Sequence, residues 1–132
     1  MVLRIFSLTP WARIARLYRG RALLLSDKVH EALDEFNTII ETNPSDADAL
    51  TFRGQAHAML GDVSAAIKDY TIALQSDPAQ PVAHFLRGAS LINNGKFKEA
   101  EEDFDKIVDR ESNQTTPLLP AEKAWLCHQD TY

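Results

Sequence analysis

Apolar residues in this chain recur at intervals of three and four, the spacing that places side chains on one face of an α-helix. One such series is Val29, Ala32, Phe36 and Ile39. No stretch alternates apolar and polar residues for long, so strands are not indicated. The pattern predicts helices over residues 10–25, 28–42, 46–59, 63–76, 80–93 and 97–110, and therefore an all-α fold.

The helical pattern repeats along the chain at a constant interval of 34 residues. An arginine-glycine pair recurs at Arg19–Gly20, Arg53–Gly54 and Arg87–Gly88. An alanine recurs at Ala32, Ala66 and Ala100, and an aromatic residue recurs at Phe36, Tyr70 and Phe104. Self-similarity at a fixed period of this length is the signature of a repeat architecture in which each repeat is one supersecondary unit.

The period divides the chain into a lead-in of residues 1–12, three repeats at 13–46, 47–80 and 81–114, and a tail of residues 115–132. Each repeat has room for two helices of about 14 residues joined by short turns. Thr9 is an expected N-cap, followed by Pro10 at the first helical position. The second helices of the first two repeats end at Asn43-Pro44 and Asp77-Pro78, because proline disfavours helix at the residue before it.

These residues at this period resemble the tetratricopeptide repeat family, and the resemblance covers 102 of the 132 residues. It implies a right-handed α-solenoid of three stacked antiparallel helix pairs. Three positions depart from the family pattern. Arg16 stands where a large apolar residue is usual, Asp27 replaces a turn glycine, and Ser112 replaces a closing proline. End repeats are often atypical, because one face of each has no neighbouring repeat.

A glycine in the middle of a helix lowers stability by about 1 kcal/mol relative to alanine. Such glycines nevertheless recur at Gly20, Gly54 and Gly88. We therefore expect the two helices of each repeat to approach closely at these points. The expected facing contacts are Ala32, Ala66 and Ala100.

The resemblance also implies that the first helices of the repeats line a concave groove for a protein or peptide partner. The partner-binding residues that it implies are Leu17, Arg21, Leu24, Thr51, Gln55, Met59, Phe85, Ala89 and Ile92. The lining is apolar at both ends, which favours an extended peptide or an amphipathic helix with apolar anchors. The alternative is that a terminal segment of the same chain covers the apolar members.

A subgroup of the family binds the acidic C-terminal motif of heat-shock chaperones through a clamp of lysine, asparagine and arginine side chains. The matching residues here are Leu17, Arg21, Gln55, Phe85 and Ala89. Arg21 is the one basic member of this set, so charge-assisted contacts to a terminal carboxylate are largely missing. We predict that the chain does not bind that motif.

The recurring arginines Arg19, Arg53 and Arg87 allow two interpretations. They could bind phosphate or another acidic ligand. The favoured interpretation is structural, because an acidic residue follows each arginine at the same interval, at Glu35, Asp69 and Asp103. We expect one ion pair within each repeat.

Composition narrows the function classes. The chain is 45% hydrophobic and 25% charged, as folded proteins are, and its formal net charge of −5 disfavours a nucleic-acid partner. No apolar run approaches the roughly 20 residues that span a bilayer. No phosphate loop, nucleophile elbow or triad spacing is visible, and the four histidines and Cys127 lack zinc-site spacing. We predict a non-catalytic protein without metal or cofactor.

The single cysteine fits a reducing compartment, so the cytoplasm is the predicted location. Residues 1–26 carry five arginines and no acidic residue, which resembles a mitochondrial presequence and gives the alternative location.

Two functions stay open at this point. The first is a protein-binding scaffold that uses the groove. The second is a structural subunit, or a shortened fragment, that stacks on another chain through its end repeats, with self-association through residues 2–8 or Trp125. Residues 121–128 are expected to form a short helix that caps the third repeat. The alternatives are that this tail is disordered or that the chain is a shortened version of a longer array.

Overall fold

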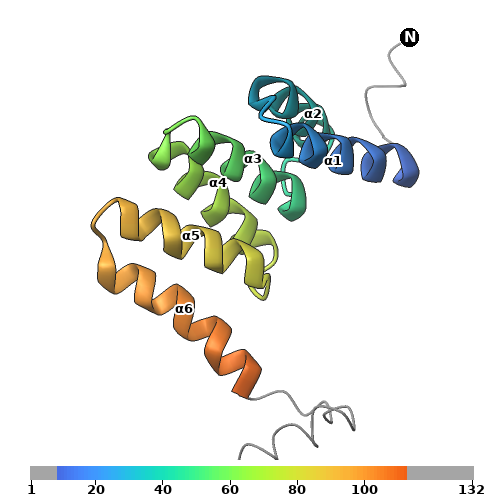
Figure 1. The fold of residues 1–132 in the computed structure, drawn as a ribbon. Coiled ribbons are helices and arrows are strands. Elements are labelled where there is room, and N and C mark those ends of the chain that lie inside the picture. Colours follow the sequence, from blue (N-terminus) through green and yellow to red (C-terminus); the bar gives the residue numbers. More distant parts are fainter. Residues whose placement is uncertain (1–8, 113–132) are drawn as a thin grey trace, which may run out of the picture.

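The computed structural model describes residues 9–112, which form six helices and, within that range, no strand. The helices are α1 (Pro10–Leu25), α2 (Val29–Thr42), α3 (Ala47–Met59), α4 (Val63–Ser76), α5 (Pro81–Asn93) and α6 (Phe97–Ser112). Every boundary lies within two residues of the predicted one. The hairpins are stacked in order, from α1 and α2 at one end to α6 at the other (Figure 1). The prediction of an all-α helical solenoid is confirmed.

Two expectations concern the ends of the chain. The capping helix at residues 121–128 and the apolar lead-in at residues 2–8 lie outside the described residues.

Side-chain caps begin three of the helices. The hydroxyl of Thr9 accepts a hydrogen bond from the amide of Ala12 at 3.1 Å, as the sequence predicts. Asp46 and Asp62 cap α3 and α4 in the same way, by accepting from the amides of Ala49 and Ala65. Each cap satisfies a helical N–H group that has no partner within the helix.

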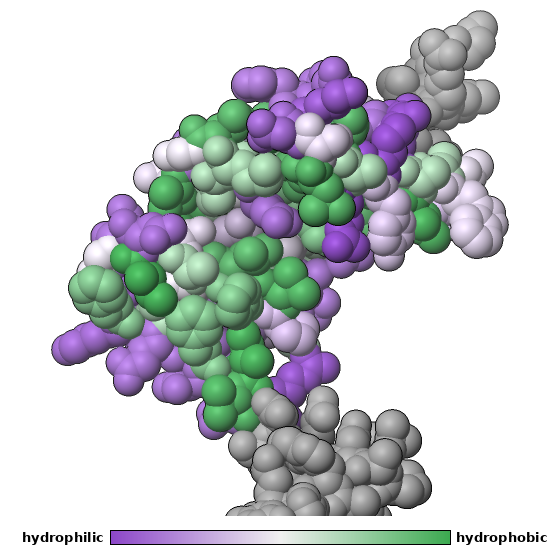
Figure 2. Space-filling model, in the orientation of Figure 1, coloured by the Kyte–Doolittle hydropathy of each residue, from purple (hydrophilic) through white to green (hydrophobic). Residues whose placement is uncertain are grey.

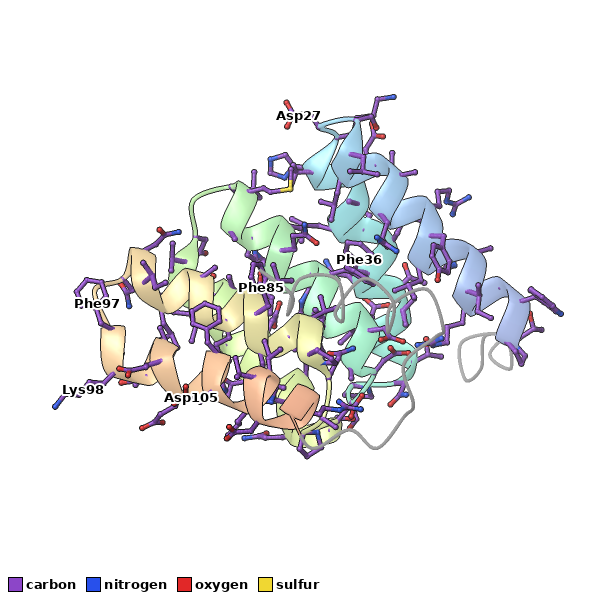
Figure 3. All side chains as sticks on the ribbon, turned by 60° about the horizontal axis from the view of Figure 1, so that its bottom comes forward. Asp27, Phe36, Phe85, Phe97, Lys98 and Asp105 are labelled. Carbon is purple, nitrogen blue, oxygen red and sulfur yellow. The ribbon has the colours of Figure 1, made fainter. Side chains whose placement is uncertain are left out.

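The turns inside the repeats require a left-handed backbone conformation. Gly61 and Gly95 have φ angles of 84° and 77°, and glycine adopts these without steric penalty. In the first repeat the same place is taken by Asp27, whose φ is 63° (Figure 3). Aspartate tolerates this conformation better than most residues but less well than glycine. Asp27, which departs from the glycine of the family pattern, therefore keeps the same left-handed turn.

The hydrophobic core is shared across the boundaries between repeats. Each helix packs on the next along the chain, and α1 also touches α3, as α3 touches α5. One cluster joins Phe36 and Ile39 of the first repeat to Ala49 and Ala56 of the second. A further cluster spans α3, α4 and α5. No described hairpin buries its apolar side alone, which is the stacking logic of repeat proteins.

The glycines pack against aromatic rings, which corrects one expectation. A Cβ atom at Gly54 would lie 2.5 Å from Cε1 of Tyr70 and 3.1 Å from the backbone oxygen of Ala66. Gly20 and Gly88 face the ring of the recurring aromatic residue in their own repeat. The expected alanine is among the three nearest contacts at Gly54, through its backbone oxygen, while at Gly20 and Gly88 the nearest atoms all belong to the ring. The absent side chain makes room for an aromatic ring in each repeat and, at Gly54, also for the close approach of the α4 backbone.

Candidate functional site

The recurring arginines form the ion pairs that their spacing predicts. Arg53 donates through Nε and Nη2 to both carboxylate oxygens of Asp69, each at 2.8 Å. Arg87 makes the same two-pronged contact with Asp103, and Arg19 donates to Glu35. Bidentate pairs of this kind are geometrically specific. The structural interpretation of the arginine row is confirmed.

Two of these arginines also join neighbouring repeats. Nη1 of Arg53 donates to Oδ1 of Asn37 on α2 at 3.0 Å. Nη1 of Arg87 donates to the hydroxyl of Thr71 on α4 at 3.4 Å. Each guanidinium thus holds an acid within its own repeat and a polar group of the preceding one, which leaves few donors for a phosphate ligand.

Two buried carboxylates have a lowered pKa. Burial by itself would raise the pKa of Asp103, but hydrogen bonds from Arg87 and His84 outweigh it and bring the pKa below its usual value. The same balance holds at Asp46, where the effect of burial on the pKa is outweighed by hydrogen bonds from Arg13 and the amide of Ala49. Both groups are ionised in the folded chain at neutral pH.

These lowered pKa values predict acid sensitivity. An unfolded aspartate takes up its proton near pH 4, while Asp46 and Asp103 resist protonation in the folded chain. Below about pH 4 the unfolded state therefore binds more protons, and the free energy of unfolding falls as the pH falls. Urea unfolding between pH 7 and pH 3 measures this slope. Asp103→Asn should flatten it, and an unchanged slope in that variant would contradict the prediction.

Three residues of the predicted groove lining are buried. Leu17 is 5% exposed and Thr51 is 1% exposed, and Leu24 is similarly enclosed. The Thr51 hydroxyl donates to the carbonyl of Ala47 and lies 2.7 Å from Oε1 of Gln80. These side chains contribute to packing between repeats and present almost no surface to a ligand.

The other predicted residues have accessible surface. Arg21, Met59, Phe85 and Ile92 are exposed, and Gln55 and Ala89 are half-buried. The structure brings Arg21, Leu24 and Gln55 together with Leu25 around a small hollow of about 50 Å³ between α1 and α3. The guanidinium of Arg21 lies 4.9 Å from the ring centre of Phe52, a cation–π geometry that holds it against α3.

The last repeat presents an apolar surface. Val82, Phe85, Ala89 and Ile92 are spaced by three and four along α5 and form one face, which we call the α5 stripe. Phe85 is 56% exposed, and Val82 and Ile92 are similarly open. Figure 2 shows apolar side chains gathered over this part of the molecule. The edge of the Phe85 ring meets Phe104 on α6, with 5.9 Å between ring centres, so this anchor is held in place.

A larger hollow, of about 350 Å³, was not predicted from the sequence. Its walls come from the turn between α4 and α5 and from the second half of α6, at Pro78, Ala79, Pro81, His84, Lys106, Ile107 and Arg110. The sequence does contain a signal for this hollow, because two polar residues replace apolar core residues. His84 and Lys106 stand one period after Leu50 and Ile72, which pack in the core of the second repeat. Both ring nitrogens of His84 are already engaged, with Asp103 and the carbonyl of Pro78.

The described residues offer little for other chemistry. Within residues 9–112 no three metal-binding side chains lie together. Among the same residues, no helix has the length and apolarity that crossing a membrane requires. His128 and Cys127 lie outside this range.

Solved structures with similar folds include tetratricopeptide repeat (TPR) domains and a secretion chaperone. The first TPR of Spaghetti (RPAP3), bound to the HSP90 peptide SRMEEVD, has a TM-score of 0.73 at 21% identity, covering 82% of this chain and 86% of that chain. The second TPR of the same protein, with the same peptide, has 0.69 at 25%, covering 73% and 89%. The Yersinia enterocolitica type III secretion translocator chaperone SycD has 0.74 at 18%, covering 81% and 80%.

No curated protein matches the chain. The family model described as tetratricopeptide repeat does match, over residues 17–81 and again over residues 60–115. The two matches together run from the middle of α1 to beyond the end of α6, and they include the recurring glycine, alanine and aromatic positions of all three hairpins. The chain belongs to the tetratricopeptide repeat family.

Proposed function

We propose that this chain is a non-catalytic scaffold that holds the apolar side of a peptide or an amphipathic helix. The observation that carries the proposal is the α5 stripe, where large apolar side chains are open to solvent on one helical face. Contiguous exposed apolar surface is a mark of interaction sites. Helical ligands present apolar anchors at the same spacing of three and four residues, so the two patterns are complementary.

Other exposed members of the proposed groove extend the contact towards the first repeat. Met59 near the end of α3 offers a flexible apolar side chain, and such side chains adapt to partners of varied shape. Gln55 and Arg21 offer hydrogen-bond donors beside the small hollow. An apolar anchor at α5 and a polar contact at α1 would fix the direction of a bound peptide.

The α5 stripe gives a direct test of the proposal. Phe85→Asp and Ile92→Asp together place two charges in the apolar contact and should weaken binding of the partner at least tenfold. Both side chains are exposed, so the fold should persist. The variant and the wild-type chain would each be used as bait, and captured proteins then titrated in purified form.

Phe97→Asp is the matched control, since it makes the same kind of change at an exposed aromatic residue outside the stripe. A partner that binds the wild type and the Phe97 variant equally, and fails to bind the stripe variant, supports the proposal. A partner whose affinity is the same for all three chains would exclude the stripe as its site.

The HSP90 peptide gives a second test, with a negative expected result. The two Spaghetti domains are bound to SRMEEVD in their structures. In this chain the corresponding clamp positions include buried Leu17 and apolar Phe85, so a terminal carboxylate finds few charged donors. Calorimetric titration should show no saturable binding up to about 1 mM peptide, which corresponds to roughly −4 kcal/mol. Micromolar binding that Arg21→Ala abolishes would refute the expectation.

The cytoplasm stays the predicted location, with the mitochondrion as the alternative. Both come from residue composition and need a measurement of where the full chain resides.

A further inference from the structure

The outer face of α1 repeats a surface that is buried elsewhere in the molecule. Ala15, Tyr18 and Ala22 are exposed, and Tyr18 is 57% exposed. The residues one repeat period later, on α3, are Ala49, Phe52 and Ala56. Both alanines of α3 are fully buried in the cluster that joins α3 to the first repeat, and Phe52 packs against the same cluster. The face of α1 therefore has the composition of a junction between repeats.

The outer face of α6 is the complementary half of such a junction. Val108 is 57% exposed, whereas Leu74, its equivalent in the preceding repeat, is 7% exposed and packs in one cluster with Ala83 of the following repeat. Ile40, one further period back, is also partly buried against that cluster. Within the described residues, Val108 has no following helix to cover it.

Contacts at the internal junctions define the pairing. The rings of Phe36 and Phe52 stack with 6.1 Å between centres. Phe104 on α6 stands two repeat periods after Phe36, and Tyr18 on α1 stands one period before Phe52. Two hydrogen bonds join neighbouring repeats, from Arg53 to Asn37 and from Arg87 to Thr71. The residue equivalent to both arginines on α1 is Arg19, and the residue equivalent to both acceptors on α6 is Asp105.

The polar groups at the two ends are charged, whereas one member of each internal contact is neutral. Arg19 donates to Glu35 through Nε, and no described residue accepts a hydrogen bond from its Nη atoms. Asp105 is exposed on α6 (Figure 3) and makes no ion pair with any described residue. An arginine–carboxylate contact is charge-assisted, while the internal contacts to Asn37 and Thr71 are to neutral groups.

The net charges of the two end helices are also opposite. α1 contains four arginines and no acidic residue. α6 contains seven acidic and three basic residues. Opposite fields of this kind steer the ends of two molecules together and oppose contact between like ends.

We propose that the chain self-associates head to tail, with α1 of one copy packed on the outer face of α6 of a second copy, in the register of the internal repeat junctions. Tyr18 meets Phe104, Ala15 meets Val108, and Arg19 pairs with Asp105 across the contact. The contact joins two different faces, so it adds further copies in a row unless one end is occupied. It uses the outer faces of α1 and α6 and includes no residue of the α5 stripe.

Two single-face variants test the arrangement in the full chain. Ala15→Arg obstructs the α1 face, and Val108→Arg obstructs the α6 face; both positions are exposed, and matching circular dichroism melts would verify the fold. Sedimentation velocity of the wild type should show species that grow with concentration. Each variant alone should be monomeric. An equimolar mixture of the two should form a dimer that grows no further, because one intact face of each kind remains.

Charge reversal on α6 tests the predicted ion pair. Asp105→Arg should weaken self-association about tenfold or more, as loss of a charge-assisted contact does. Glu102→Arg is the matched control on the same helix, since its equivalents Asp34 and Lys68 stay exposed in the internal repeats, and it should leave association unchanged.

Three results would overturn the proposal. The first is a wild-type chain that is monomeric at every concentration, as it would be if residues 113–132 of the same chain occupied α6. The second is association that survives Ala15→Arg. The third is a mixture of the two single-face variants without dimer, which would indicate a symmetric contact of another kind.

Discussion

Replacing Arg53 by methionine should lower the free energy of unfolding by about 3 kcal/mol. The change leaves the carboxylate of Asp69, which is almost fully buried, without its two hydrogen bonds from the guanidinium. A buried charge that loses its partner destabilises a fold far more than the intact pair stabilises it, because the charge loses most of the groups that solvate it. At Asp69, Nε2 of His57 remains 3.7 Å from Oδ2. The contact from Arg53 to Asn37 is lost as well, so the junction with the first repeat is also weakened. Urea unfolding at pH 7 measures the effect.

The double change Arg53→Met with Asp69→Leu is the informative control. It removes the charge together with its partner, and well-packed apolar residues in place of a buried ion pair are often neutral or stabilising. The double variant should therefore recover most of the loss of the single variant. If the single variant is as stable as the wild type, the pair is a solvated surface contact and the buried-charge account is wrong.

Gly54→Leu should destabilise the fold by roughly 1–3 kcal/mol, the range for overpacking a core. The first added carbon would already lie 2.5 Å from the ring of Tyr70, which is 1% exposed. The backbone oxygen of Ala66 closes the other side at 3.1 Å. Thermal or urea unfolding of the purified variant would show the loss.

Two companion changes separate crowding from helix propensity. Gly54→Ala improves propensity by about 1 kcal/mol, yet it should still destabilise, because the β-carbon alone meets the ring. Gln75→Leu adds an apolar side chain at an exposed site on α4 and should change stability by less than about 0.5 kcal/mol. A stabilising Gly54→Ala change would show that the ring can shift.

The constant repeat period made most of the fold predictable from the sequence. It predicted the six helices and the pairs from Arg53 to Asp69 and from Arg87 to Asp103, because both depend on positions that recur in every repeat. The aromatic ring that lies against each of the three recurring glycines was missed. Ala66 and Tyr70 are one helical turn apart on the same face of α4, and periodicity cannot tell which of them lies nearer to Gly54.

The site was less predictable than the fold. The family pattern places Leu17, Thr51 and Phe85 at one equivalent position, yet the first two are buried and the third is exposed. The difference in exposure comes from the residue that the next repeat places beside each side chain. Gln80, from the loop before α5, lies against the Thr51 hydroxyl, and no described residue of a following repeat covers Phe85. Such effects depend on which side chain the next repeat supplies, which a repeat pattern does not specify.

The sharing of each core between adjacent hairpins has a mechanical consequence. In a fold whose parts touch mainly their nearest neighbours, a pulling force on the two ends is not spread over a common centre. Small rotations at each junction should let the array lengthen while every helix stays intact. Under stronger tension it should come apart one hairpin at a time, so that the molecule behaves as a short spring and not as a rigid block.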